Sequence, residues 1–207
     1  MHILLTLEII GTMAFAISGA IVGIQNQMDI FGVSILGLTT AVGGGVLRDL
    51  ILNITPPAAF RTPFFAVTAV TVSIVMFIKP IHSSFEQAGT IYEKLLLIMD
   101  SIGLGLFTVI GIQAAKASSA DTNLFLETFV GVLTGVGGGL MRDVFAGKKP
   151  SIFVKNFYAC ASIIGAWACV LLWPHIGDNA AMAVGAALIV VLRLLAAHFR
   201  WSLPKAQ

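Results

Sequence analysis

Charged side chains are scarce in this 207-residue chain, and their scarcity excludes most classes of soluble protein. Asp, Glu, Lys and Arg together make up 11% of the residues, whereas about a quarter of an ordinary globular domain is charged. Hydrophobic residues reach 57%, and the mean hydropathy is +0.96. A formal net charge of +2 is too small to indicate a nucleic-acid partner. Because most of its surface has to be apolar, we expect an integral membrane protein surrounded by lipid.

The patterns that mark enzymes and metal sites are missing as well. The cysteines, Cys160 and Cys169, lie too far apart along one predicted helix to pair with each other. The four histidines do not have the spacing of metal ligands. Gly147-Lys148 lacks the upstream glycine and the following Ser or Thr of a phosphate-binding loop, and no Ser, His and acidic residue are grouped as in a catalytic triad. We therefore expect neither an enzyme nor a bound cofactor.

Seven hydrophobic stretches are long enough to cross a bilayer, which requires about 20 apolar residues per helix. They cover residues 4–24, 31–51, 62–79, 95–115, 124–145, 153–173 and 180–199. Because only short connections remain, the sequence predicts one all-α transmembrane domain over residues 1–207. Asp29 and Asp121 precede the second and fifth stretches, where a carboxylate would cap a helix N-terminus. Glu127 lies early in the fifth stretch, and we expect its negative charge to stabilise the N-terminal end of that helix.

Basic residues in the connections predict the orientation, because Lys and Arg concentrate on the cytoplasmic side of membrane proteins. One side of the predicted topology carries only Arg61 and Lys116. The other side carries Lys79, Lys94, Lys148, Lys149, Lys155, Arg200 and Lys205. We expect the C-terminus in the cytoplasm and the N-terminus outside. The first stretch is not expected to be a signal peptide, since no basic residue precedes it and Glu8 lies inside it.

An internal repeat is the most informative pattern in the chain. Gly43-Gly44-Gly45-Val46-Leu47-Arg48-Asp49 matches Gly137-Gly138-Gly139-Leu140-Met141-Arg142-Asp143 at an offset of 94 residues. The same offset relates Gly37 to Gly131. Upstream the offset becomes 92 and relates further pairs: Glu8 and Asp100, Gly11 and Gly103, Phe15 and Phe107, and Gly19 and Gly111.

The repeat predicts an inverted topology. Each copy, about residues 4–80 and about residues 95–173, contains three predicted helices. Because three is an odd number, the second copy enters the membrane from the opposite side, as in many transport proteins. The seventh helix, about residues 180–199, lies outside the repeat.

The glycine triplets are the first candidate site residues. Each glycine weakens a helix interior by about 1 kcal/mol relative to alanine, so we expect kinks at Gly43, Gly44 and Gly45 and at Gly137, Gly138 and Gly139. Backbone groups freed by a kink must face protein or water, because lipid cannot satisfy them. Freed carbonyls near the triplets could coordinate a cation, or freed helix N-termini an anion. The alternative is that the glycines only permit close helix packing.

Charged residues follow both triplets. Arg48, Asp49, Arg142 and Asp143 are costly in lipid, by about 2.5–3.5 kcal/mol each at the bilayer centre. Because neighbours in sequence do not face each other on a helix, we expect each arginine to pair elsewhere, with the other repeat or with a freed carbonyl. The alternative is that these side chains extend to the membrane interface.

Further polar residues could belong to the same pathway. Glu8 and Asp100 could form cation-attracting mouths, or could simply stabilise the N-terminal ends of their helices. Thr39, Thr40 and Thr134 precede the triplets. They could line the pathway or bond back to carbonyls of their own helices.

The duplicated Gly-Gly-Gly-x-x-Arg-Asp motif resembles that of the prokaryotic TRIC family, the trimeric intracellular cation channels, whose bacterial relatives also carry a glycine-transporter label. The resemblance covers essentially the whole chain. It implies a homotrimer in the inner membrane, with one pore per subunit that conducts monovalent cations, chiefly potassium. It also implies that the first, second, fourth and fifth helices line the pore, and that the second and fifth are kinked at the glycines. The alternative is a secondary transporter of a small zwitterion such as glycine.

Overall fold

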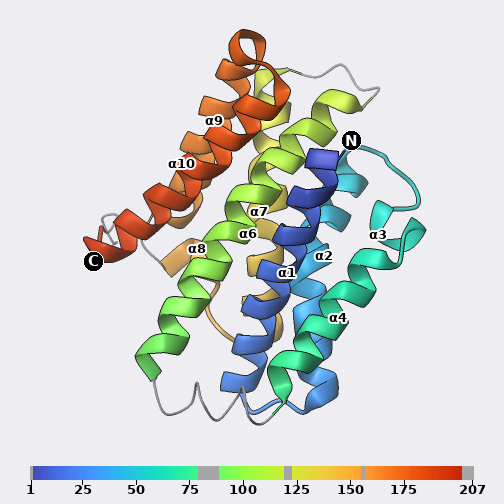
Figure 1. Cartoon of the computed structure of the whole chain (residues 1–207), viewed down its shortest axis with the longest axis vertical. Helices are drawn as coiled ribbons and strands as arrows, with labels where there is room; N and C mark the ends of the chain where they lie inside the picture. The colour runs from blue at the N-terminus through green and yellow to red at the C-terminus, as the bar shows by residue number, and fades with distance from the viewer. Residues whose placement is uncertain (1, 79–88, 119–122, 155–156, 202–207) are drawn as a thin grey trace.

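The computed structural model describes residues 2–78, 89–118, 123–154 and 157–201, and all secondary structure in these residues is α-helical (Figure 1). The helices are α1 (His2–Gln25), α2 (Ile30–Ile51), α3 (Ala58–Arg61), α4 (Phe64–Phe77), α6 (Gly89–Ala117), α7 (Leu124–Phe145), α8 (Ser151–Val154), α9 (Tyr158–Ile176) and α10 (Asp178–His198). The predicted all-α class is therefore confirmed.

Six of the described helices are long and apolar enough to cross a membrane, namely α1, α2, α6, α7, α9 and α10. The protein is an integral membrane protein. The predicted third stretch, 62–79, corresponds to α4, which is apolar but has 14 residues in the described part of the chain. A count of seven spanning helices therefore stays a prediction.

The helix N-termini follow the expected chemistry with two differences. The Asp29 carboxylate accepts a hydrogen bond of 2.7 Å from the first turn of α2, as predicted. Asn123 caps α7, while Asp121 lies outside the described residues. Glu127 lies in the first turn of α7, as expected, and its carboxylate also pairs with Lys116 of α6 at 2.7 Å, which the sequence did not indicate.

The centre of the bundle is made by α1, α2, α6 and α7. Helix α1 packs against α2, α4 and α6, and α7 packs against α2, α6 and α9, while α10 lies against α6 and α9. Figure 1 shows that α1 and α6 run in opposite directions, because α1 begins at the end of the bundle where α6 terminates. This direction is the one that the predicted inverted repeat requires.

Two close helix contacts lie at positions related by the predicted repeat. A Cβ on Gly19 of α1 would lie 2.7 Å from the Cα of Gly37 of α2, and a Cβ on Gly111 of α6 would lie 2.9 Å from the Cα of Gly131 of α7. Real Cβ atoms do not approach other atoms so closely, so both crossings depend on glycine. The α1–α2 and α6–α7 pairs thus approach each other through matching residues.

Candidate functional site

The two glycine triplets meet where α2 crosses α7. A Cβ on Gly44 would overlap the carbonyl oxygen of Thr134, and a Cβ on Gly138 would overlap the carbonyl oxygen of Thr40. Both helices continue through their triplets without interruption. The described contacts are those of close helix packing, one of the two alternatives that the sequence left open, and the predicted kinks stay a prediction.

The threonines near the triplets bond to their own helices. The hydroxyls of Thr39, Thr40 and Thr134 each donate to the carbonyl four residues earlier, at 2.8, 2.6 and 2.6 Å. Thr40 and Thr134 are fully buried. Their hydroxyls are therefore occupied within the helix, which corresponds to the second of the alternatives considered for them.

The third glycine of each triplet has polar rather than backbone neighbours. A Cβ on Gly139 would lie 2.8 Å from the hydroxyl oxygen of Tyr158, 3.6 Å from Oδ1 of Asp100 and 3.7 Å from Nη2 of Arg142. For Gly45, the nearest atom is Nη2 of Arg48, at 3.9 Å from such a Cβ. The middle glycines thus hold the helices together, and the third glycines border the charged groups.

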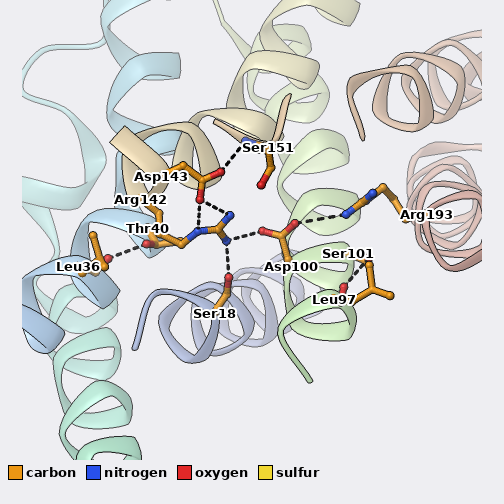
Figure 2. Close-up of polar contacts among 10 residues, drawn as sticks. All are labelled: Ser18, Leu36, Thr40, Leu97, Asp100, Ser101, Arg142, Asp143, Ser151 and Arg193. Carbon is orange, nitrogen blue, oxygen red and sulfur yellow. Dashed lines mark hydrogen bonds and ion pairs between the residues drawn. The ribbon is translucent and has the colours of Figure 1, made fainter. Parts of the chain in front are cut away.

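Arg142 is the centre of a buried polar cluster that joins three helices (Figure 2). Its guanidinium contacts Oδ1 of Asp100 on α6 at 2.6 Å and Oδ1 of Asp143 at 2.9 Å, and it donates to the hydroxyl of Ser18 on α1. Arg142 is only 2% exposed. The Arg142 side chain is therefore buried and neutralised by acidic partners, and it does not extend to the membrane interface.

The expectation that each arginine pairs away from its neighbour was wrong in part. The Nε of Arg48 donates to Asp49 at 2.8 Å, as that of Arg142 does to Asp143. Adjacent residues of a helix point in different directions. The arginine side chain is nevertheless long enough to bend along the helix surface until its Nε reaches the carboxylate of the next residue. For Arg142, the expected distant partners also exist, and they are Asp100 and Ser18.

Each aspartate of the motif also holds the short helix that follows. Oδ2 of Asp49 accepts a hydrogen bond from the backbone N–H of Ala58, the first residue of α3, at 2.7 Å. Oδ2 of Asp143 accepts one from the N–H of Ser151, the first residue of α8, at 2.7 Å. Sequence reasoning missed these contacts. The prolines just before Ala58 and Ser151 were the available signal, since proline favours the start of a helix.

Arg193 of α10 was also missed. Its Nη2 lies 3.7 Å from Oδ2 of Asp100, and its guanidinium stacks 4.6 Å from the ring centre of Tyr158. Figure 2 shows Asp100 between Arg142 and Arg193. An arginine in a spanning segment is by itself a signal of a functional site, but Arg193 lies outside the repeat that directed attention to the other charges.

Two cavities bring the predicted site residues into two groups. The α8-side cavity, of about 630 Å³, is lined by residues of α1, α6, α7, α8 and α10, including Asp100, Arg142, Asp143 and Arg193. The α3-side cavity, of about 60 Å³, is lined by Glu8, Gly45, Arg48, Asp49 and others from α1, α2, α3, α4 and α6. Each cavity thus contains the Arg-Asp pair of one repeat together with the upstream acid of the same repeat, Asp100 in the α8-side cavity and Glu8 in the α3-side cavity.

The cavities contact α1 near opposite ends and are separated by aromatic packing. The α3-side cavity reaches Glu8 and Thr12, and the α8-side cavity reaches Val22. Thr12 and Val22 are about 15 Å apart along a helix. Between them, Phe15 is 1% exposed and its ring stacks on that of Phe107 at 5.2 Å.

Metal-ligand chemistry is not visible in the described residues, where no three His, Cys, Asp or Glu side chains converge. The arrangement instead offers separate carboxylates, each beside a guanidinium. Such groups can attract a hydrated monovalent cation without binding it tightly.

Comparison with known proteins identifies relatives over nearly the whole chain. A family model described as "Glycine transporter" matches residues 5–80 and 97–174. A UPF0126 membrane protein of Deinococcus radiodurans is 38% identical over 90% of this chain and 84% of that protein. The UPF0126 inner membrane protein YadS of Escherichia coli is 34% identical over 95% of this chain and 92% of that protein.

Solved structures share the fold. One from a study of conductance through TRIC cation channels is 35% identical, with a TM-score of 0.85 over 98% of this chain and 96% of that one. A TRIC orthologue from Rhodobacter sphaeroides is 29% identical, with a TM-score of 0.87 over 97% of this chain and 100% of that one. These structural relatives are channels rather than enzymes. By its fold and its match to the family model, the chain belongs to the prokaryotic TRIC family, as its duplicated motif indicated.

Proposed function

We propose that this protein is a monovalent cation channel that conducts chiefly potassium, with one pathway through each subunit. The observation that carries the proposal is the pair of charged cavities that approach each other from opposite ends of α1. Each holds a carboxylate at a repeat-related position, Glu8 or Asp100. The solved relatives with this fold are described as cation channels.

The pathway would run between α1, α2, α6 and α7, which form the centre of the bundle. It would pass the third glycines, Gly45 and Gly139, where the polar side chains gather and where a potassium ion would be held with its hydration largely retained. The arginines do not oppose this, because Arg48 and Arg142 are each paired with an acid. In the described conformation, the stacked rings of Phe15 and Phe107 stand between the cavities, so we assign it to a closed state.

We further infer a homotrimer in the inner membrane. The relative from Rhodobacter sphaeroides is described as trimeric, and the one from Escherichia coli as an inner membrane protein. Exposed phenylalanine and tryptophan side chains, such as Phe153 and Trp167, suit contact with lipid or with neighbouring subunits. Size-exclusion chromatography with light scattering, corrected for detergent, tests the trimer: a monomer mass would exclude it.

The C-terminus would lie in the cytoplasm. Lys148 and Lys149 line the same cavity as Ala197 near the end of α10, so these basic residues and the end of α10 are on one side. Helix α1 begins at the opposite end of the bundle (Figure 1). Of the other basic residues behind the predicted orientation, Lys79, Lys155 and Lys205 lie outside the described residues.

A membrane-potential assay in liposomes tests the ion preference. Proteoliposomes loaded with potassium chloride are diluted into a solution of an impermeant salt, and a potential-sensitive dye reports the sign of the voltage. A potassium pathway makes the interior negative, because potassium leaves without chloride. A positive interior, or no signal beyond that of protein-free liposomes, would exclude the proposal.

A secondary transporter of a small zwitterion such as glycine is the second candidate. The barrier between two cavities would suit alternating access. However, α2 and α7 are uninterrupted at the triplets, so they present no helix N-terminus there for a carboxylate. Saturable counterflow of labelled glycine in the same proteoliposomes, without a membrane potential, would favour the transporter.

A further inference from the structure

The acids matched by the repeat have different surroundings. Asp100 lies between two guanidinium groups, with Arg142 at 2.6 Å and Arg193 at 3.7 Å (Figure 2). Glu8 shares its cavity with one arginine, Arg48. The difference arises from α10, which lies outside the repeat and packs beside α6. Among the described residues that line the α3-side cavity, Arg48 is the only arginine, so none of them corresponds to Arg193.

This difference changes the formal charge of the two groups. Asp100 and Asp143 are balanced by Arg142 and Arg193, so the group in the α8-side cavity is neutral. In the α3-side cavity, Glu8 and Asp49 share a single arginine, so that group has a formal charge of −1. The remaining lining residues increase the contrast, because the α8-side cavity as a whole has four basic and three acidic side chains.

We propose that Arg193 sets the electrostatic difference between the two ends of the cation pathway and makes the channel rectify. The proposal rests on the proposed function, since it concerns the same pathway. Cations are therefore more concentrated at the α3-side cavity than at the α8-side cavity. At equal and opposite voltages, the larger current is the one in which cations enter at Glu8 and leave past Arg193.

Burial is the reason to assign this role to Arg193 rather than to the surface lysines. Arg193 is 3% exposed and its guanidinium is held against the ring of Tyr158. A charge in such a low-dielectric position acts strongly on a nearby ion. Lys148 and Lys149 are exposed, so dissolved salt screens them over about 10 Å at 0.1 M. Arg193 acts as a positioning residue as well, because its charge holds Asp100 in place opposite Arg142.

Single-channel recording tests the proposal. In symmetric KCl of about 0.1 M, the ratio of the currents at equal and opposite voltages is measured for each channel, which requires no knowledge of how it inserted. We expect the wild type to depart from a ratio of one. Arg193→Gln should raise the smaller of the two currents, and the ratio of the larger to the smaller current should fall towards one by a factor of about two to three. Arg193→Lys, which keeps the charge, should retain the wild-type ratio.

Glu8→Gln provides a second test that leaves the Asp100 cluster intact. It removes the excess negative charge of the α3-side cavity, so the ratio should also approach one, but through a fall in the larger current. Thermal unfolding shows whether Arg193→Gln folds. If it does not, the current ratio of Glu8→Gln tests the proposal alone. A wild-type ratio of one, or unchanged ratios in both variants, would overturn the proposal while leaving a cation channel in place. The absence of any cation current would instead overturn the proposed function together with this inference.

Discussion

Gly44 of α2 and Gly138 of α7 pack reciprocally at the centre of the bundle. Each lies against the carbonyl oxygen of the threonine one helical turn before the other, Thr134 for Gly44 and Thr40 for Gly138. The two halves of the chain therefore touch through backbone atoms at their most similar residues. The third glycine of each triplet instead borders a guanidinium of its own helix, Arg48 for Gly45 and Arg142 for Gly139.

Gly44→Ala and Gly138→Ala should each destabilise the protein. The added Cβ would overlap a backbone carbonyl oxygen, which cannot move away as a flexible side chain could. We expect a loss of about 1–3 kcal/mol in the free energy of unfolding. Thermal unfolding of the purified variants in detergent measures it.

Gly45→Ala is the matched control for these variants. The added Cβ would have Arg48 Nη2 as its nearest neighbour, at an ordinary distance of 3.9 Å. Because alanine favours a helix over glycine by about 1 kcal/mol, this variant should be as stable as the wild type or more so. Equal destabilisation by Gly44→Ala and Gly45→Ala would contradict the described packing.

Asp100→Asn should be strongly destabilising. It removes the carboxylate that lies between Arg142 and Arg193, in a site where both guanidinium groups are buried, and leaves Arg142 with Asp143 and Ser18. Removing one member of a buried ion pair typically costs about 3–5 kcal/mol. The measurement is the unfolding temperature in detergent, compared with Glu8→Gln, whose half-buried side chain should cost about 1 kcal/mol or less.

Arg193→Gln should partly rescue Asp100→Asn. The double variant restores the formal balance of one arginine and one aspartate around Arg142, so the two changes should not add. A coupling free energy above about 1 kcal/mol in the double-mutant cycle would support direct interaction. Strict additivity would show that Asp100 and Arg193 do not interact across the 3.7 Å between them.

The ion pair between Lys116 and Glu127 should stabilise the other end of the bundle. Their side chains are 26% and 8% exposed, and the Lys116 ammonium also lies 5.3 Å from the ring centre of Trp173. Lys116→Met would leave Glu127 buried without this partner, at a cost of about 1–3 kcal/mol, below that of a fully buried pair. Trp173→Leu, which keeps the ion pair, should cost less if the carboxylate is the main partner of Lys116.

Phe15→Leu should increase the time that the channel spends open. The substitution keeps an apolar side chain at the barrier but removes the stacking of Phe15 on Phe107. Single-channel open probability is the readout. Phe125→Leu is the control, because that ring is 77% exposed on the outside of the bundle and should leave gating unchanged.

Residue spacing was sufficient to predict the all-α class and which glycines occupy matching positions in the two repeats, but not the contacts that these glycines make. Long apolar stretches predict spanning helices because lipid leaves few alternatives for the backbone, and Asp29 caps α2 as its position indicated. The repeat related Gly19 to Gly111 and Gly37 to Gly131, and these positions make matching contacts. Such features depend on local chemistry or on periodicity, which a sequence displays directly.

The charged cluster could not be predicted to the same degree. The three glycines of a triplet are identical in sequence, but successive residues point about 100° apart around a helix, so only the structure distinguishes Gly44 from Gly45. The pairing of Arg142 with Asp100 depends on how α6 and α7 pack. Arg193 joins the cluster from a helix outside the repeat, and no spacing in the sequence relates it to Asp100.

The reversal potential of single channels tests the central claim most directly. Purified protein is placed in a planar bilayer with unequal KCl concentrations on the two sides. We predict discrete openings that reverse close to the equilibrium potential of potassium. Reversal near the chloride potential, or protein that gives no unitary current but supports saturable glycine counterflow, would contradict a potassium channel.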